Sequence, residues 1–173
     1  NYDNVIRKLK SHGFKLVNTN SNTMLRIMFD KKNIRCEING IESISKYCKT
    51  NTFHKLNSKS YSFVEKTGVK DEDGIYIKNV EMEDFNFRVS YKKETLITNV
   101  EQLDNLNSEW RDLKKIFRYI NRISLIHDDY PYLRIDLSIV KSSNERGSDM
   151  DKRYVSEYTI DRANVFNNPE KYE

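Results

Sequence analysis

Three stretches of the chain alternate apolar and polar residues with the period of two that a β-strand produces. They are residues 85–92, 116–126 and 133–141. Each has one face of mostly aliphatic or aromatic side chains and one face that carries charge. The charged faces hold Arg88, Lys92, Arg118, Arg122, Arg134 and Asp136. The pattern predicts three strands that present basic side chains on one side.

The second and third of these strands are predicted to form an antiparallel pair, because a polar turn at residues 128–131 lies between them. Their arginines would then share one face of the sheet. Two interpretations stay open. In the first, that face lies in water and the arginines are ordinary surface residues. In the second, the sheet curls and its polar face lines a concavity where guanidinium groups hold a polyanion such as a phosphate chain.

The rest of the chain adds helices and further strands. A short helix capped by Asp3 ends at Gly13, and residues 24–29 and 34–38 form a hairpin around a polar turn at 30–33. Apolar spacing predicts helices over 41–48 and 100–115, and strands over 61–65, 75–80 and 154–160. Asn99 and Gln102 resemble a capping pair for the later helix, whose Trp110 is predicted to anchor the core.

Composition narrows the class of protein. The 173 residues include five glycines and two prolines, and 37% are hydrophobic, which predicts a single folded domain over residues 1–173. A formal charge of +4 permits contact with nucleic acid without requiring it. Cys36 and Cys48 form no metal or disulfide pattern, which suits a reducing compartment, and the three histidines form no catalytic triad. No apolar run is long enough to predict a membrane span.

Four segments resemble a known family when they are taken in order. They are FRYINRISLIHDDYPYLRIDLSIVKSS, YVSEYTIDRANVFNNPEKYE, FNFRVSYKKE and IRCEINGIESISKYCKTN. Together they are similar to the RNA 5′-triphosphatase domain of mRNA capping enzymes of large nucleocytoplasmic DNA viruses, of the mimivirus type. The resemblance covers most of the chain and is most specific between residues 116 and 143.

The resemblance implies a fold, an activity and a setting. The fold would be α+β, mainly antiparallel β: the β-barrel tunnel of the triphosphate tunnel metalloenzymes with a few flanking helices. The activity would be Mg²⁺- or Mn²⁺-dependent hydrolysis of the γ-phosphate at the 5′-triphosphate end of nascent RNA. Other capping-enzyme domains on the same chain are the expected partners, with no membrane. The expected location is the host-cell cytoplasm or the virion.

The resemblance also assigns site residues. Arg134 and Asp136 match the family's Arg-x-Asp strand and are the expected catalytic pair. Arg122 matches a basic position of the preceding strand, and Arg118 replaces a lysine that the family often has where this chain has Ile120. Arg88, Arg118, Arg122 and Lys92 are the expected phosphate contacts.

The metal ligands of the family lie on its first and last strands. The chain begins at Asn1 without methionine, and Glu173 stands where the last acidic strand would begin. We therefore expect a fragment of a longer chain that lacks the first and last strands, keeps Glu173 as its metal ligand and is inactive alone.

Two other functions stay open. The chain could be a non-catalytic, β-rich module that binds RNA or docks a subunit within a viral transcription or capping complex. It could also be a degenerate tunnel that acts on a nucleotide or inorganic triphosphate instead of RNA.

Overall fold

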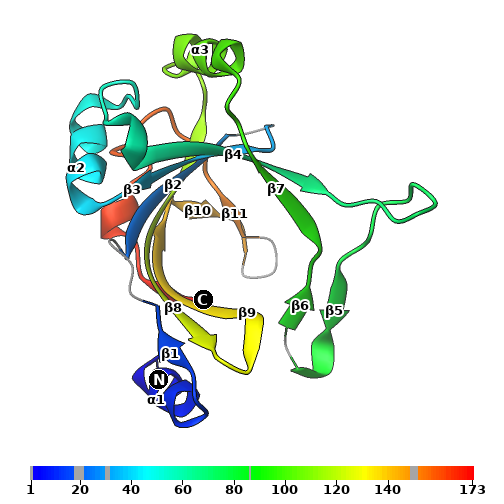
Figure 1. The fold of residues 1–173 in the computed structure, drawn as a ribbon. Coiled ribbons are helices and arrows are strands. Elements are labelled where there is room, and N and C mark those ends of the chain that lie inside the picture. Colours follow the sequence, from blue (N-terminus) through cyan, green and yellow to red (C-terminus); the bar gives the residue numbers. More distant parts are fainter. Residues whose placement is uncertain (1, 18–21, 30–31, 86, 149–151) are drawn as a thin grey trace.

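The computed structural model describes residues 2–17, 22–29, 32–85, 87–148 and 152–173. Its centre is an antiparallel sheet with the strand order β12-β9-β8-β2-β3-β4-β7, to which β1 is added beside β8. The strands are β1 (Lys15–Leu16), β2 (Thr23–Phe29), β3 (Ile34–Asn39), β4 (Tyr61–Gly68), β7 (Lys92–Leu96), β8 (Lys115–His127), β9 (Tyr130–Ser142) and β12 (Lys171–Tyr172). The sheet curls into a half-barrel (Figure 1). The fold is thus the α+β, mainly antiparallel architecture that the sequence predicts.

Three α-helices and two small sheets flank the half-barrel. The helices are α1 (Tyr2–Ser11), α2 (Ile41–Thr50) and α3 (Val100–Glu109). The small sheets pair β5 (Val80–Met82) with β6 (Phe87–Val89), and β10 (Glu145–Arg146) with β11 (Arg153–Tyr154). Single 3₁₀ turns lie at Ser58–Ser60, Glu83–Phe85 and Val165–Asn167. The Asn99 side chain accepts a hydrogen bond of 3.0 Å from the Gln102 N–H and so caps α3.

The hydrophobic core lies on the convex side of the sheet, where α2 packs (Figure 1). Trp110 is 1% exposed and sits at its centre. Its ring packs edge-on against Phe29, Tyr47 and Phe53, and its indole N–H donates to the Asn51 carbonyl at 3.0 Å. The prediction of Trp110 as a core anchor is confirmed. Since the core takes one face of each strand, the alternate side chains point into the concave side.

A lysine is buried at the start of β8. The Lys115 side chain is fully buried, and its ammonium group donates to the carbonyls of Trp110 and Leu113 at 2.6 Å. It also lies 5.3 Å from the centre of the Trp110 ring. Burial lowers the pKa of Lys115 from 10.5 to about 8. The two carbonyl bonds fix the bend that turns the chain from α3 into β8.

Replacing this lysine should change the pH dependence of stability. Between pH 8 and 10.5 the unfolded chain keeps a proton on Lys115 that the folded chain has released, so the free energy of unfolding rises with pH through this group. Relative to Lys115→Met, the wild-type protein should therefore gain roughly 1–3 kcal/mol across that window. Urea denaturation of both proteins at several pH values measures this difference, and parallel pH profiles would contradict it.

The predicted strand over residues 85–92 is wrong as a single element. A 3₁₀ turn ends at Phe85, residue 86 lies outside the described residues, β6 ends at Val89 and β7 begins at Lys92. β6 pairs with β5 instead of the main sheet. The predicted apolar face is consequently exposed, by 50% at Phe87, 52% at Val89 and 60% at Tyr91. Alternation alone could not tell a short hairpin outside the core from a core strand.

Three other boundaries differ from the prediction. Helix α3 ends at Glu109, six residues early, because the chain must turn Trp110 into the core and begin β8 at Lys115. Residues 75–79 belong to no strand, since the Asp71 carboxylate holds a turn by accepting from the Ile75 N–H at 2.8 Å. Within residues 154–160, a turn replaces the strand after Tyr154 and buries Ile160 in the core.

The two hairpins that frame the site are confirmed. β2 pairs with β3, and β8 pairs with β9, both antiparallel. Residues 30 and 31 of the predicted β2–β3 turn lie outside the described residues. Leu133, on the apolar face of β9, is 46% exposed. Further along the strand, the Tyr2 hydroxyl of α1 donates to the Leu137 carbonyl at 3.2 Å.

No helix in the described part of the chain is both long enough and apolar enough to cross a lipid bilayer.

Candidate functional site

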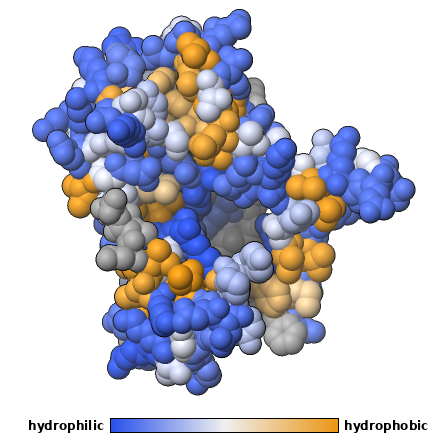
Figure 2. All heavy atoms as spheres, in the orientation of Figure 1, coloured by the Kyte–Doolittle hydropathy of each residue, from blue (hydrophilic) through white to orange (hydrophobic). Residues whose placement is uncertain are grey.

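The concave face of the half-barrel gathers charged side chains from the strands of the main sheet. The strand registers align Arg26 of β2 with Glu37 of β3 and with Arg118 of β8. Figure 2 shows a hollow in this face that is surrounded by hydrophilic side chains. The charged residues on this side include Arg26, Arg35, Glu37, Lys66, Lys92, Glu94, Arg118, Arg122, Arg134, Asp136, Lys171 and Glu173. The curled sheet with a polar concavity, the second interpretation of the sequence, is therefore the one the protein adopts.

A cavity of about 670 Å³ lies at the end of this face near β3, β4 and β7. Its described lining has six basic side chains and no carboxylate. The basic residues are Arg26, Lys32, Arg35, Lys66, Lys92 and Arg118. Five of the six form ion pairs with carboxylates outside the lining: Glu37, Glu94, Glu109 and Glu173. The basic groups that line the hollow itself can attract an anion with several charges.

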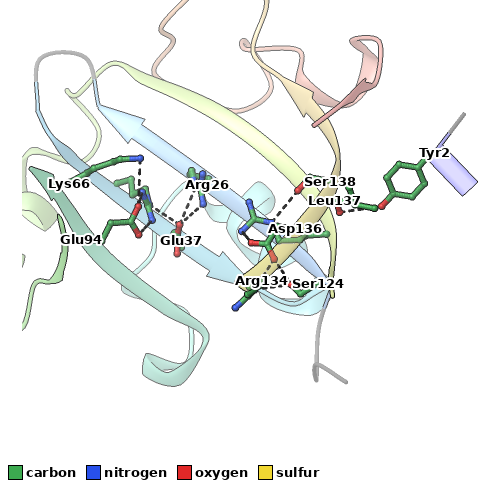
Figure 3. Close-up of polar contacts among 12 residues, drawn as sticks. Tyr2, Arg26, Glu37, Lys66, Glu94, Ser124, Arg134, Asp136, Leu137 and Ser138 are labelled. Atoms are coloured by element: carbon green, nitrogen blue, oxygen red, sulfur yellow. Dashed lines mark hydrogen bonds and ion pairs between the residues drawn. The ribbon is translucent and has the colours of Figure 1, made fainter. Parts of the chain in front are cut away.

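The arginines beside the cavity are fixed by two glutamates (Figure 3). Glu37 accepts hydrogen bonds from Arg26 Nε at 3.0 Å and from Arg35 Nε at 2.8 Å. Arg35 also forms a two-point pair with Glu94, at 2.9 and 2.6 Å. The side chains of Arg26, Arg35 and Glu37 are only 16%, 12% and 13% exposed. Arg35 is held by two glutamates and Arg26 by Glu37, so the orientation of both guanidiniums is set before any ligand binds.

The two arginines of this group differ in their electrostatics. Burial lowers the pKa of Arg26, and although Glu37 opposes that effect, the charges of Arg35 and Arg122 lower the pKa further. Burial also lowers the pKa of Arg35, but Glu94 and Glu37 outweigh burial and raise it. The hydrogen bonds from Arg35 in turn lower the pKa of the Glu94 carboxyl. Arg35 and Arg122 thus repel Arg26, and a bound anion would relieve that repulsion.

A second cluster lies next to the first along the sheet and centres on Asp136 (Figure 3). Its carboxylate accepts from Ser124 Oγ at 2.6 Å and Arg134 Nε at 2.7 Å, and lies 3.3 Å from Arg122 Nη1. Arg122 Nε donates to Ser138 Oγ at 3.1 Å. Burial raises the pKa of Asp136, but the bonds from Ser124 and Arg134 and the charges of Arg122 and Arg134 outweigh it and lower the pKa. Asp136 is therefore ionised at neutral pH and orients two arginines.

Arg118 connects the two clusters. It faces Arg26 across β2 and β8, lines the cavity and forms an ion pair with Glu173. Its Nε is buried and has no hydrogen-bond partner among the described residues. The hydroxyl of Ser142, its register partner on β9, is also buried without one. Buried polar groups in proteins are nearly always paired, so these donors indicate a place where a ligand or water binds.

Most of the site residues that the sequence predicts lie together on the concave face. These residues are Lys92, Arg118, Arg122, Arg134, Asp136 and Glu173. Arg88 lies elsewhere, on the β5–β6 hairpin, where it is 60% exposed and pairs with Glu81. Its role as a phosphate contact stays a prediction.

Sequence reasoning missed Arg26, Arg35, Glu37, Lys66 and Glu94. The signal was present, because charged residues alternate with Leu25, Ile27, Cys36 and Ile38 in β2 and β3. The two strands of this hairpin were predicted from their apolar residues alone.

The expected metal ligands were looked for among the acidic and other ligating side chains. Within residues 2–17, 22–29, 32–85, 87–148 and 152–173, no three His, Cys, Asp or Glu side chains form a group that could hold a metal ion. Glu173, the predicted ligand, reaches the concave side through its backbone pairing with Ser138 and is paired with Arg118. By itself it does not form a metal site.

Comparison with known proteins places this geometry in context. No protein-family model matches the chain, and no curated protein matches it at a significant level. Among solved structures, a monoclinic form of the mimivirus capping enzyme triphosphatase is similar over 99% of this chain and 73% of its own, with a TM-score of 0.55 and 15% sequence identity. The half-barrel with a basic concave face therefore has the fold of a viral capping enzyme triphosphatase.

Proposed function

We propose that the concave face of this chain binds a 5′-triphosphate, and that the chain is the RNA 5′-triphosphatase part of a viral mRNA capping enzyme. The observation that carries the proposal is the cavity beside Arg118, with six basic side chains and no carboxylate among its described lining residues. Guanidinium groups bind phosphate oxygens through paired, charge-assisted hydrogen bonds. The similarity in fold to the mimivirus enzyme supports the same conclusion.

The cluster around Glu37 and the cluster around Asp136 would contact different phosphates of the substrate. Lys92 and Arg118, together with Arg26 and Arg35, would hold the terminal phosphates in the cavity. Arg122 and Arg134 would stabilise the charge that develops on the RNA diphosphate as it leaves. Asp136 would act by keeping these two arginines in position.

Mg²⁺ or Mn²⁺ is part of the proposal. Mg²⁺ in phosphoryl-transfer sites is held by one or two carboxylates together with phosphate oxygens of the substrate. Glu173 would be such a carboxylate, released from Arg118 when the phosphate chain binds. The ion would supply a nucleophilic water and offset phosphoryl charge. Since the described residues offer no group of three ligands, we expect the 173-residue chain alone to release little phosphate.

The same proposal implies a substrate, partner domains and a place of action. The substrate is the triphosphate end of nascent RNA, and further capping-enzyme domains on one longer chain are the expected partners. The place of action is the host-cell cytoplasm or the virion.

The test is release of γ-phosphate from triphosphate-ended RNA by a chain extended at both ends. We expect release with Mn²⁺ or Mg²⁺ and none with EDTA, because the ion generates the nucleophile. Inorganic tripolyphosphate as a second substrate distinguishes an RNA enzyme from a general triphosphatase. Release from tripolyphosphate alone would overturn the RNA assignment.

Absence of release from a folded, extended chain would favour the non-catalytic alternative, a module that binds RNA or a subunit. RNA affinity at two salt concentrations would then be decisive, since phosphate-backbone binding weakens steeply with salt.

A further inference from the structure

A buried serine on β9 has a hydroxyl group without a partner. Ser142 is 4% exposed, and its Oγ forms no hydrogen bond with any described residue. Burying a hydroxyl in this way costs free energy, because the hydrogen bonds that it made to water are not replaced. In the described part of the chain, one other buried side-chain atom is unpaired in the same way, and it is Nε of Arg118.

The two unpaired atoms belong to neighbouring side chains. Arg118 and Ser142 are register partners on β8 and β9. The adjacent residues, Phe117 and Ser143, are joined by a backbone hydrogen bond of 2.9 Å. Arg118 and Ser142 therefore form the non-hydrogen-bonded type of antiparallel pair, in which side chains approach each other most closely. Because Arg118 lines the cavity, Ser142 points to the same concave side of the sheet.

Open space lies on both sides of this pair. Arg118 borders the cavity of about 670 Å³, and Ser142 borders a second cavity of about 150 Å³. Lys171, whose ammonium group pairs with Glu145, also lines the second cavity. Both unpaired atoms are buried, so a ligand reaches them only when a neighbouring group moves. In the proposed function Glu173 leaves Arg118 when the phosphate chain binds, and that departure frees the guanidinium to turn.

We propose that the Ser142 hydroxyl and the Arg118 Nε–H donate to one phosphate oxygen of the bound triphosphate. The proposal rests on the proposed function and adds an uncharged phosphate-binding residue to the same site. Both groups can donate, and hydrogen bonds to an ionised oxygen are stronger than those between neutral groups. The ligand thus pairs two buried groups that have no partner in the free protein. The Ser142 hydroxyl should therefore destabilise the free protein and stabilise the complex.

The experiment measures affinity and stability of the 173-residue chain in EDTA, so that no phosphate is hydrolysed. Isothermal titration calorimetry gives the Kd of inorganic tripolyphosphate, and urea denaturation without ligand gives the midpoint of unfolding. In Ser142→Ala we expect the Kd to rise about tenfold, the loss typical of one hydrogen bond to a charged group. The midpoint should equal that of the wild-type protein or exceed it, because the variant buries no unpaired hydroxyl at this position.

Two further variants separate the hydrogen bond from packing and from stability. Ser142→Cys fills nearly the same space, but its thiol is a weak donor, so its Kd should rise as in Ser142→Ala. Thr52→Val is the matched control, because Thr52 is also 4% exposed but follows α2 and has a hydroxyl bonded to His54. Its midpoint should fall, since a made hydrogen bond is lost, and its Kd should stay within about twofold.

Each result has a defined meaning. If the wild-type protein fails to bind tripolyphosphate, the proposed function itself is wrong. If it binds, and Ser142→Ala loses less than about twofold in affinity, the role of Ser142 is wrong and the triphosphate site stands. A lower midpoint in Ser142→Ala also overturns that role, because the hydroxyl would then have a partner in the free protein. Wild-type affinity in Ser142→Cys would mean that the site requires volume at this position and not a donor.

Discussion

The Arg118→Ala variant is expected to bind inorganic tripolyphosphate about 100-fold more weakly than the wild-type protein. Arg118 lines the basic cavity and has a buried Nε–H with no partner among the described residues. Removing one member of a buried, hydrogen-bonded charge pair typically has an effect of this size. Isothermal titration calorimetry measures it, and circular dichroism establishes that the variant is folded.

Two further variants make the result specific. Arg118→Lys keeps the charge but loses the planar fork, so its affinity should fall between those of Arg118→Ala and the wild-type protein. Arg146→Ala removes an exposed cation from β10 that does not line the cavity, and should leave affinity within about twofold. Equal losses in Arg118→Ala and Arg146→Ala would mean that net charge, and not the cavity, attracts the anion.

The Glu37→Gln variant is expected to be less stable by about 3 kcal/mol and to bind tripolyphosphate more tightly. Glu37 is 13% exposed and accepts from both Arg26 and Arg35, whose side chains are also largely buried. Loss of its charge leaves two buried guanidiniums without their shared anion, which is strongly destabilising. A polyanion in the cavity supplies the missing charge, so the ligand should stabilise the variant more than the wild-type protein.

Urea denaturation with and without tripolyphosphate measures both effects. Glu94→Gln is the matched control: Glu94 also pairs with Arg35 but is 45% exposed, so its loss should have an effect below about 1 kcal/mol. A Glu37→Gln variant as stable as Glu94→Gln would show that the arginines do not depend on Glu37. Tighter binding of tripolyphosphate by Glu37→Gln is the outcome that connects Arg26 and Arg35 to the anion site.

The strands of the site were largely predictable, and their boundaries were not. β8 and β9 each alternate over many residues, so the period of two identifies both strands and the side on which Arg118, Arg122 and Arg134 lie. The range 85–92 alternates equally well but forms two short strands in different sheets. The difference depends on which partner each backbone segment finds, and that information lies far away along the chain.

The acidic partners of the arginines illustrate the same limit. Arg35 and Glu94 are 59 positions apart in the sequence, yet they form a two-point ion pair because β3 and β7 both lie beside β4. No local pattern relates these two residues. The buried Lys115 is a similar case, since nothing in its neighbours predicts that Trp110 and the carbonyls around it would enclose an ammonium group.

The sequence by itself determined the class of fold and the presence of strands with a basic face. Alternation with a period of two depends only on neighbouring residues, and it defines strands with one apolar and one basic face. The short polar turn at residues 128–131 makes two of them an antiparallel pair. Only the tertiary structure decided that the basic face is concave, that Arg26 and Arg35 join Arg118 around one cavity, and that Arg88 does not. Curvature and strand order arise from packing between segments distant in sequence, and they determine which charges converge.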